Sequence, residues 1–172
     1  MSDVPDLVKP GLAVLFCGIN PGTRSGELAQ HFARPGNRFW RVLHGAGFTD
    51  SVVPPAEQHR LLDYGIGITN LVERTSRAAS DLTAAELRAG AAGLEGKVAL
   101  LGPRWVAVLG VAAYRTAFRR PTARIGRQEE TIDGRAGLWV LPNPSGLQAR
   151  YQLAEMIDLY RQLRVAADTV AP

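Results

Sequence analysis

The sequence predicts an α/β fold in which helices cover both faces of a mostly parallel β-sheet. Short apolar runs alternate along the chain with segments whose apolar residues recur at helical spacing, a pattern typical of strand-helix-strand units. The chain has 172 residues, of which 46% are hydrophobic, enough for one well-packed core and too few for two. We therefore expect a single domain over residues 1–172, with a loosely ordered tail after about Ala166.

The first half of the chain supplies two strands and two helices. Residues 12–18, "LAVLFCG", form an apolar run typical of a buried strand. Helical spacing follows at residues 37–48 and 55–65, and the segment 65–72, "GIGITNLV", is predicted to be extended again. The alternation of strand and helix is therefore established before the middle of the chain.

The second half repeats this alternation. Thr83 and Glu86 match a capping box, which predicts a helix beginning after Thr83. A strand at 104–110, a short helix at 111–118 and a strand at 137–146 that runs into a proline-rich loop follow. The apolar positions of the two longer helices are Leu87, Leu94, Val98 and Leu101 in the first, and Leu153, Met156, Ile157, Tyr160 and Leu163 in the second, which begins at about Tyr151.

The charge of the chain favours a polyanionic partner. The net charge is +4 and the sequence pI is about 9.7. Five arginines and no acid lie between Arg115 and Arg127. This stretch could follow a phosphate backbone, or it could be a solvated, arginine-rich surface loop.

Cysteine, histidine and hydropathy exclude other classes. Cys17 is the only cysteine, and the three histidines are scattered, so we expect no metal, iron–sulfur cluster or intrachain disulfide. The N-terminus carries acids and prolines, and no apolar run approaches the ~18 residues of a membrane span. We expect a cytoplasmic protein and a monomer.

Two loops begin where hydrophobic strands end: "GINPG" at 18–22 and "NPSG" at 143–146. Ligands of such folds bind at the carboxyl ends of the strands. If these two strand ends are neighbours in the sheet, the loops face each other across one cleft.

Neither loop matches a common phosphate-binding or hydrolase motif. Gly18 and Gly22 are separated by three residues, and no lysine follows them, so the phosphate-binding P-loop and the dinucleotide fingerprint are both broken. Ser145 has Gly146 directly after it and Pro144 before it, which does not match the Gly-x-Ser-x-Gly elbow of serine hydrolases, and it has no convincing histidine partner. One amide, Asn20, remains on a rigid turn; its oxygen could position a water, or the side chain could only tie the loop together.

Four blocks together resemble the mismatch-specific uracil/thymine DNA glycosylase family, within the uracil-DNA glycosylase superfamily. They are "GINPG" with Phe32 after it, "PGNRFW" (35–40), "GITNLVER" (67–74) and "LPNPSGL" (141–147). The resemblance covers about residues 9–164, and it implies a cytoplasmic protein that is associated with the nucleoid when it acts on DNA. It implies a three-layer α/β/α sandwich with a short central, mostly parallel sheet, no cofactor or metal, and removal of uracil, and often thymine or modified pyrimidines, from double-stranded DNA.

The resemblance also implies roles for individual residues. Asn20 would position the attacking water, Phe32 would stack on the flipped pyrimidine, and Leu147 would fill the space vacated in the base stack, with Gly146 allowing close backbone approach. Phe32 and Leu147 could instead pack in the core. The residues expected to bind substrate are Gly18, Ile19, Phe32, Asn70, Asn143 and Ser145, and those expected to bind DNA are Gly146, Leu147, Gln148 and Arg150.

Two polar residues, Asn70 and Asp81, each have a functional and a structural interpretation. Asn70 could bond the base, or only the backbone at its strand end. Asp81 lies two residues before Thr83, so the capping box leaves its carboxylate free to act as an auxiliary catalytic group; a plain surface turn residue is the other interpretation.

One position departs from the family pattern. Relatives often carry arginine two residues after the wedge leucine, whereas here Ala149 stands there and the arginine is Arg150. We therefore expect a weaker requirement for guanine opposite the lesion. The predicted function is a monofunctional glycosylase that flips and hydrolytically removes uracil from mismatched duplex DNA and so initiates base excision repair; the alternative is a non-catalytic reader of uracil or mismatches.

Overall fold

The central sheet has five strands in the order β2-β1-β3-β5-β4. The structure is a computed structural model that describes residues 4–146 and 150–169. Strands β1 (Val14–Gly18), β2 (Ile66–Asn70), β3 (Trp105–Leu109) and β5 (Ala136–Leu141) are parallel to one another, and β4 (Gly126–Ile132) pairs antiparallel with β5. The predicted α/β class with a mostly parallel sheet is confirmed.

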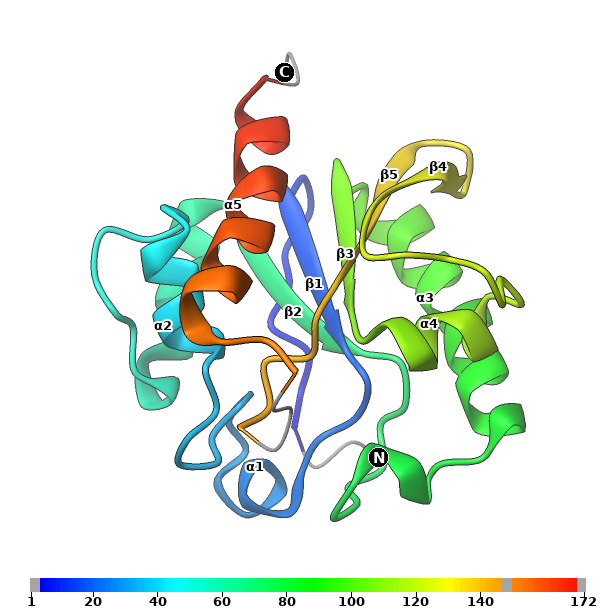
Figure 1. Ribbon diagram of the computed structural model, residues 1–172, viewed down its shortest axis with the longest axis horizontal. Coiled ribbons are helices and arrows are strands. Elements are labelled where there is room, and N and C mark those ends of the chain that lie inside the picture. The colour runs from blue at the N-terminus through cyan, green and yellow to red at the C-terminus, as the bar shows by residue number, and fades with distance from the viewer. Residues whose placement is uncertain (1–3, 147–149, 170–172) are drawn as a thin grey trace.

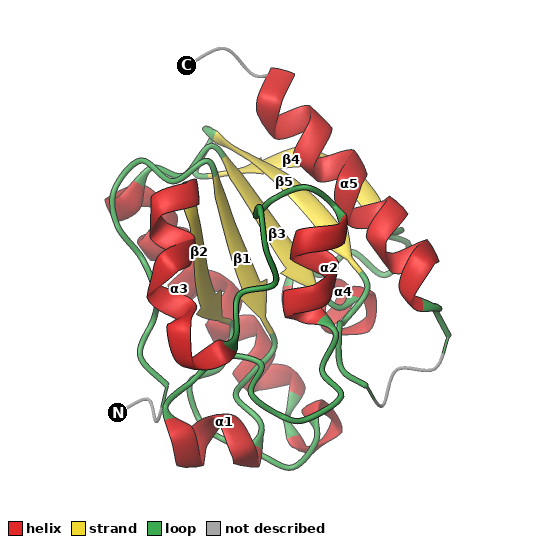
Figure 2. Cartoon of the chain, turned by 90° about the vertical axis from the view of Figure 1, so that its left-hand side faces the viewer, coloured by secondary structure: helices red, strands yellow, loops and turns green. Residues whose placement is uncertain are grey.

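Helices cover both faces of this sheet (Figures 1 and 2). Helices α2 (Phe39–Gly45) and α5 (Leu153–Thr169) lie on one face, and α3 (Ala84–Leu101) and α4 (Val111–Ala117) on the other. Side chains of β1 alternate between the two layers: Val14 and Phe16 join the core under α2 and α5, and Leu15 and Cys17 join the core under α3 and α4. The strand is buried on both faces because each parallel strand here lies between two helical layers.

Cys17 is fully buried, and its thiol lies 3.5 Å from the Gly18 carbonyl oxygen. Burial raises the pKa of this thiol to about 12. Because the thiolate is the reactive form of cysteine, Cys17 is chemically quiet at neutral pH.

Several elements differ from the sequence prediction. Residues 55–65 form a 3-10 helix, η1 (Pro55–Tyr64), with non-helical backbone angles at Glu57. Strand β4 lies partly inside the arginine-rich stretch, and polar residues along its exposed side leave little hydrophobic signal. Helix α1 (Thr23–Leu28) buries only Ser25 and was also missed. Helix α5 continues to Thr169, so the tail predicted after Ala166 is helical for three further residues.

The segment before β1 packs against the sheet. Leu7 forms an antiparallel bridge with Ile68, with two backbone hydrogen bonds of 2.9 Å. Lys97 of α3 lies 2.8 Å from the Asp6 carboxylate and donates to the Thr69 hydroxyl at 2.8 Å. Within the described residues, no helix combines the length and the apolar character needed to cross a bilayer.

Candidate active site

A cavity of about 650 Å³ lies at the carboxyl ends of β1, β2 and β3 and takes its walls from both predicted loops. The sequence-predicted residues that line it are Gly18, Ile19, Asn20, Phe32, Asn70, Asn143 and Ser145. The two strand ends are not neighbours, since β3 lies between β1 and β5. The loops nevertheless share one cavity, which residues of both loops line.

Gly110 lets the first loop approach the end of β3 closely. It follows the last residue of β3, has a φ of 150°, and a Cβ placed there would lie 2.9 Å from Cδ1 of Ile19. A glycine therefore lets Ile19 lie directly over the strand end. Leu109, the last residue of β3, contributes to the cavity wall between the two loops.

The loops that follow β1 and β2 remain paired beyond the sheet. Backbone hydrogen bonds join Leu71 N to Gly18 O (2.9 Å), Val72 N to Ile19 O (2.9 Å) and Ser76 N to Pro21 O (3.1 Å). Asn20 therefore lies in a loop whose backbone is hydrogen-bonded to the neighbouring loop on both sides of it.

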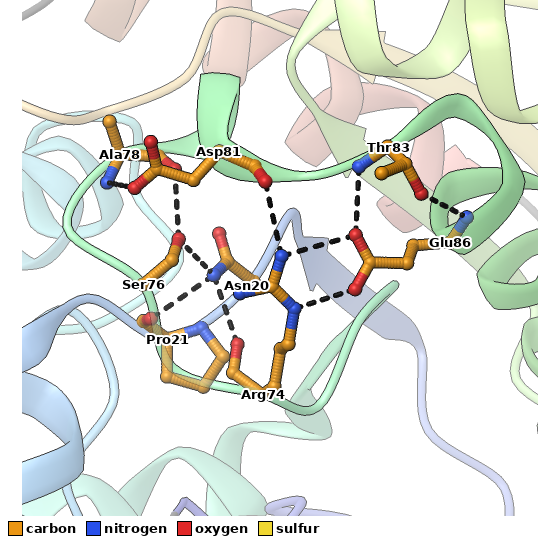
Figure 3. A network of polar contacts seen from close by, with 8 residues as sticks. All are labelled: Asn20, Pro21, Arg74, Ser76, Ala78, Asp81, Thr83 and Glu86. Atoms are coloured by element: carbon orange, nitrogen blue, oxygen red, sulfur yellow. Dashed lines mark hydrogen bonds and ion pairs between the residues drawn. The ribbon is translucent and has the colours of Figure 1, made fainter.

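The amide nitrogen of Asn20 has three acceptors around it (Figure 3). It donates to the Ser76 hydroxyl at 2.7 Å and the Arg74 carbonyl at 3.0 Å, and lies 3.3 Å from the Pro21 carbonyl. Carbonyl oxygens only accept, so these contacts decide which end of the amide is nitrogen. The Asn20 oxygen points away from them, and no residue in the described part of the chain donates to it.

Of the two tasks that the sequence left open for Asn20, the structure shows that it ties the loops together, and positioning of a water stays a prediction. Its nitrogen ties the two loops together, and its oxygen is left without a protein donor among the described residues, at the wall of the cavity. An oxygen in this position accepts a hydrogen bond from a water or from a ligand.

Gly18, Phe32 and Asn70 fit tightly around the inner end of the cavity. A Cβ at Gly18 would lie 2.5 Å from the Asn70 side-chain oxygen and 3.3 Å from the Phe32 ring, so a larger residue there would displace the Asn70 amide. Phe32 is half-buried and stacks on Phe39 with ring centroids 4.2 Å apart. It has a φ of 50°, a conformation that costs a bulky residue energy and is held here by its surroundings.

The Asn70 side chain is 9% exposed and lines the cavity. Among the described residues it has no side-chain hydrogen bond partner, so the alternative that it only bonds the backbone has no support in the structure. Its amide atoms are not among the enclosed side-chain atoms that lack a partner, so a ligand or water in the cavity can complete their hydrogen bonds.

The loop after β5 is held by its own turn and by Arg38. The Asn143 side-chain oxygen accepts from Ser145 N at 2.9 Å. Arg38 donates from its backbone to Pro144 O (2.9 Å) and from its guanidinium to Ser145 O (3.2 Å) and Tyr151 O (2.5 Å). Arg38 belongs to the quoted "PGNRFW" block, but the sequence did not indicate this task.

Of the four residues predicted to contact DNA, the structure describes two, Gly146 and Arg150. A Cβ at Gly146 would lie 2.7 Å from Gly36 O, so the close approach that this glycine permits is to the 35–37 turn of the same chain. Leu147 and Gln148 lie outside the described residues. Arg150 is exposed, with its guanidinium 5.6 Å from the centre of the Tyr151 ring.

The Asp81 carboxylate is not free, contrary to the expectation. It accepts from Ala78 N at 3.2 Å and closes the short turn η2 (Ala79–Asp81). Asp81 is absent from the cavity lining, although Ala78 and Ser80 belong to it. An auxiliary catalytic role for Asp81 remains a prediction that needs this turn to open.

The capping box of α3 has the predicted geometry and one further partner. Thr83 N donates to the Glu86 carboxylate at 2.8 Å, and Glu86 N donates to the Thr83 hydroxyl at 3.1 Å. The same carboxylate accepts a forked contact from Arg74, at 2.6 and 3.2 Å. The hydrogen bond from Arg74 lowers the pKa of Glu86 to about 2.

His31 is a neutral part of the cavity wall. Its Nε2 lies 2.9 Å from the Pro5 carbonyl, and it is 2% exposed. Burial lowers the pKa of His31 below its ordinary value. In the part of the chain that the structure describes, no three His, Cys, Asp or Glu side chains gather closely enough to hold a metal ion.

The arginine-rich stretch 115–127 is not one surface loop. Arg115 and Arg119 lie at α4, while Arg127 lies on β4 with its guanidinium 5.0 Å from the centre of the Trp105 ring. Arg115, Arg119 and Arg88 of α3 line a second hollow of about 530 Å³, here called the arginine groove. Within the described residues, none of these three side chains has a carboxylate within 4.0 Å.

Comparison with known proteins identifies the superfamily of the chain. A profile of the uracil DNA glycosylase superfamily matches residues 5–164. The chain belongs to the uracil DNA glycosylase superfamily. The superfamily match takes in every cavity-lining residue named above and the whole sheet.

A solved structure shares the fold of this superfamily member. The solution NMR structure of a candidate uracil DNA glycosylase from Methanosarcina acetivorans superposes with a TM-score of 0.61 at 20% sequence identity, covering 94% of this chain and 96% of that one. At this identity the likeness concerns the fold. Superfamily membership supports uracil DNA glycosylase activity and DNA containing uracil as the partner.

Proposed function

We propose that this protein is a monofunctional DNA glycosylase that removes uracil from mismatched duplex DNA by hydrolysis, and so initiates base excision repair. The observation that carries the proposal is the Asn20 amide, whose nitrogen is bonded to the protein and whose oxygen is left at the cavity wall. A fixed acceptor of this kind suits a water that must be held in one place.

The cavity suits a single flipped base. A base inside a duplex is out of reach of an enzyme, so it must be rotated out of the stack at a cost of a few kcal/mol, which is smallest for a mispaired base. The exposed part of Phe32 offers a surface for stacking, and the Asn70 amide offers both a donor and an acceptor to the edge of a pyrimidine.

The roles of the site residues in the reaction follow from the charge that develops as the glycosidic bond breaks. Asn20 accepts a hydrogen bond from the water, the water attacks the sugar carbon, and the carbon–nitrogen bond breaks with its electrons leaving on the base. Backbone N–H groups near Ile19 and Phe32 are the candidates to stabilise the base anion. An amide is a weaker base than a carboxylate, so we expect slow chemistry that depends on the quality of the leaving group.

The proposed reaction ends at base release. A glycosylase that also cuts the strand needs an amine to form a Schiff base with the sugar. The described residues that line the cavity include no lysine. We therefore expect an intact abasic strand as product.

Mismatched duplexes should be good substrates because their bases flip easily, yet the requirement for guanine should be weak. The arginine near the wedge position is Arg150, one place later than in many relatives, which argues against direct reading of the opposite guanine. Comparable cleavage of uracil opposite guanine, opposite adenine and in single strands is expected, and a preference of several hundredfold for G·U would contradict it.

The test is a single-turnover incubation of excess protein with labelled duplexes containing G·U, A·U or G·T, followed by alkaline cleavage at abasic sites. Release of uracil supports the proposal and ranks the substrates. Absence of product from every duplex, with binding retained in a shift assay, would instead indicate a non-catalytic reader of uracil or mismatches.

A further inference from the structure

Asn20 is not held by its own loop alone. Its two closer acceptors, the Arg74 carbonyl and the Ser76 hydroxyl, belong to the segment after β2. The position of the Asn20 oxygen is therefore as well defined as the position of residues 74–76.

That segment has no helix or strand of its own. Its backbone is paired with the first loop through the hydrogen bond from Ser76 N to Pro21 O (3.1 Å), and side-chain contacts add to this. Ser76 donates its hydroxyl to Ala78 O at 2.8 Å. The Arg74 side chain reaches across to α3, where it makes its forked contact with Glu86 and also donates to Asp81 O at 3.1 Å (Figure 3). One guanidinium thus joins the loop, the η2 turn and the first turn of a helix.

Glu86 is a firm anchor for this contact. It lies in the first turn of α3, and its carboxylate is also bonded by Thr83 N. Because α3 packs on the sheet through Leu87, Ala91, Leu94 and Val98, its first turn moves little relative to β1 and β2. The chain of contacts runs from the sheet core through α3, Glu86 and Arg74 to Asn20.

We propose that Arg74 and Glu86 are positioning residues, which hold Asn20 in the orientation needed to place the nucleophilic water. This rests on the proposed glycosylase function. The contact between them is named here the Arg74–Glu86 clamp.

The exposure of the clamp argues that its main effect is on orientation. The Arg74 and Glu86 side chains are 48% and 30% exposed, and ion pairs this accessible contribute little to the stability of a fold. Loss of the clamp should therefore leave the fold intact and loosen the 74–76 segment. A catalytic group displaced by about 1 Å can lose about a hundredfold in rate.

Two conservative variants distinguish a role in orienting Asn20 from a role in the stability of the fold. Arg74→Lys keeps the charge but cannot make the forked contact. Glu86→Gln keeps the capping box, because glutamine also serves at that position, and removes the charge that binds Arg74. Arg161→Ala is the matched control. Arg161 lies on α5 outside the cavity lining, is also 48% exposed, and donates to the Asp158 carboxylate at 2.7 Å and to Gly45 O at 3.0 Å.

The measurements are the single-turnover rate on G·U duplex, the binding constant of the same duplex, the melting temperature, and the side-chain amide NMR signal of Asn20, assigned through Asn20→Ala. We expect both clamp variants to cleave about tenfold more slowly, within the range that misplacement allows. The double variant should be no slower than the slower single variant, because the two residues act as one unit. Binding and melting should match Arg161→Ala, and the Asn20 signal should move.

Either unchanged rates in both variants or an unmoved Asn20 signal would overturn the proposal. So would rate losses that run in parallel with losses of melting temperature. The NMR signal also separates this proposal from the proposed function: a wild type that cleaves nothing, with an Asn20 signal that moves in Arg74→Lys, overturns the glycosylase and supports the clamp.

Discussion

Arginine does two different things in two regions of this molecule. At the Arg74–Glu86 clamp, the guanidinium is bonded to a carboxylate and a carbonyl, beside the cavity. In the arginine groove, Arg88, Arg115 and Arg119 line one hollow between α3 and α4, and within the described residues no carboxylate lies within 4.0 Å of them.

The difference shows that the partner of an arginine, more than its presence, indicates its task. A neutralised guanidinium such as Arg74 holds parts of the protein together. Three cations in one groove repel one another, which is a cost that a phosphate backbone would relieve. The clamp should therefore affect the chemical step, and the groove should affect DNA binding.

The largest effect on the cleavage rate should come from Asn20, the residue that the Arg74–Glu86 clamp is proposed to hold in place. Replacing Asn20 by Ala removes the oxygen that holds the water, and the single-turnover rate should fall by about 10²–10⁴. Binding of the G·U duplex should change little. Cleavage by the variant at the wild-type rate would remove Asn20 from the mechanism and with it the reason for the clamp.

Removing charge from the arginine groove should have a smaller effect, and it should weaken DNA binding without changing the cleavage rate. In Arg115→Ala/Arg119→Ala, binding to undamaged and G·U duplexes should weaken alike, and the slope of log binding constant against log salt should fall by about one for each phosphate that the variant no longer neutralises. The rate at saturating protein should stay the same.

Arg135→Ala is the control for the groove and is compared with the single groove variant Arg119→Ala, because each removes one positive charge. Arg135 lies in the turn between β4 and β5, at the other end of the sheet from the cavity. Equal salt slopes in this control and in the groove variant would show that only net charge matters, and would remove the groove from the DNA-binding surface.

The smallest expected effect concerns pH. The folded pKa of Glu86 is depressed to about 2 from its ordinary 4.5, so the stabilisation given by its ionised form is fully present above pH 4.5 and is lost as pH falls through about 2. Carbon NMR of the Glu86 carboxyl should show no titration between pH 7 and 4. A midpoint near 4.5 would mean that the clamp is open in solution.

The sequence was most informative where local rules decide the structure. The capping box of Thr83 and Glu86 is short-range, and it was predicted with the correct partners. Both cavity loops were found because each follows a strongly apolar strand. Strand β4 was missed because an edge strand with polar residues on its exposed side carries little hydrophobic pattern.

The tasks of Arg38 and Arg74 depend on contacts across the fold. Arg38 reaches residues more than 100 positions away, and Arg74 uses a glutamate that the sequence had already assigned to a cap. Neither partner is fixed by spacing along the chain. The same holds for Asp81, whose carboxylate is used by the Ala78 backbone and so is less available than the sequence indicated.

The buried thiol of Cys17 makes this chain a convenient host for a reporter. With one cysteine in the sequence, its side chain enclosed and its pKa raised to about 12, maleimide dyes should leave the wild type unlabelled. A cysteine introduced on the exposed Arg34 or Ser80, at the rim of the cavity, would then take up a single fluorophore. Its emission would follow a base entering the cavity in real time, before any bond is broken.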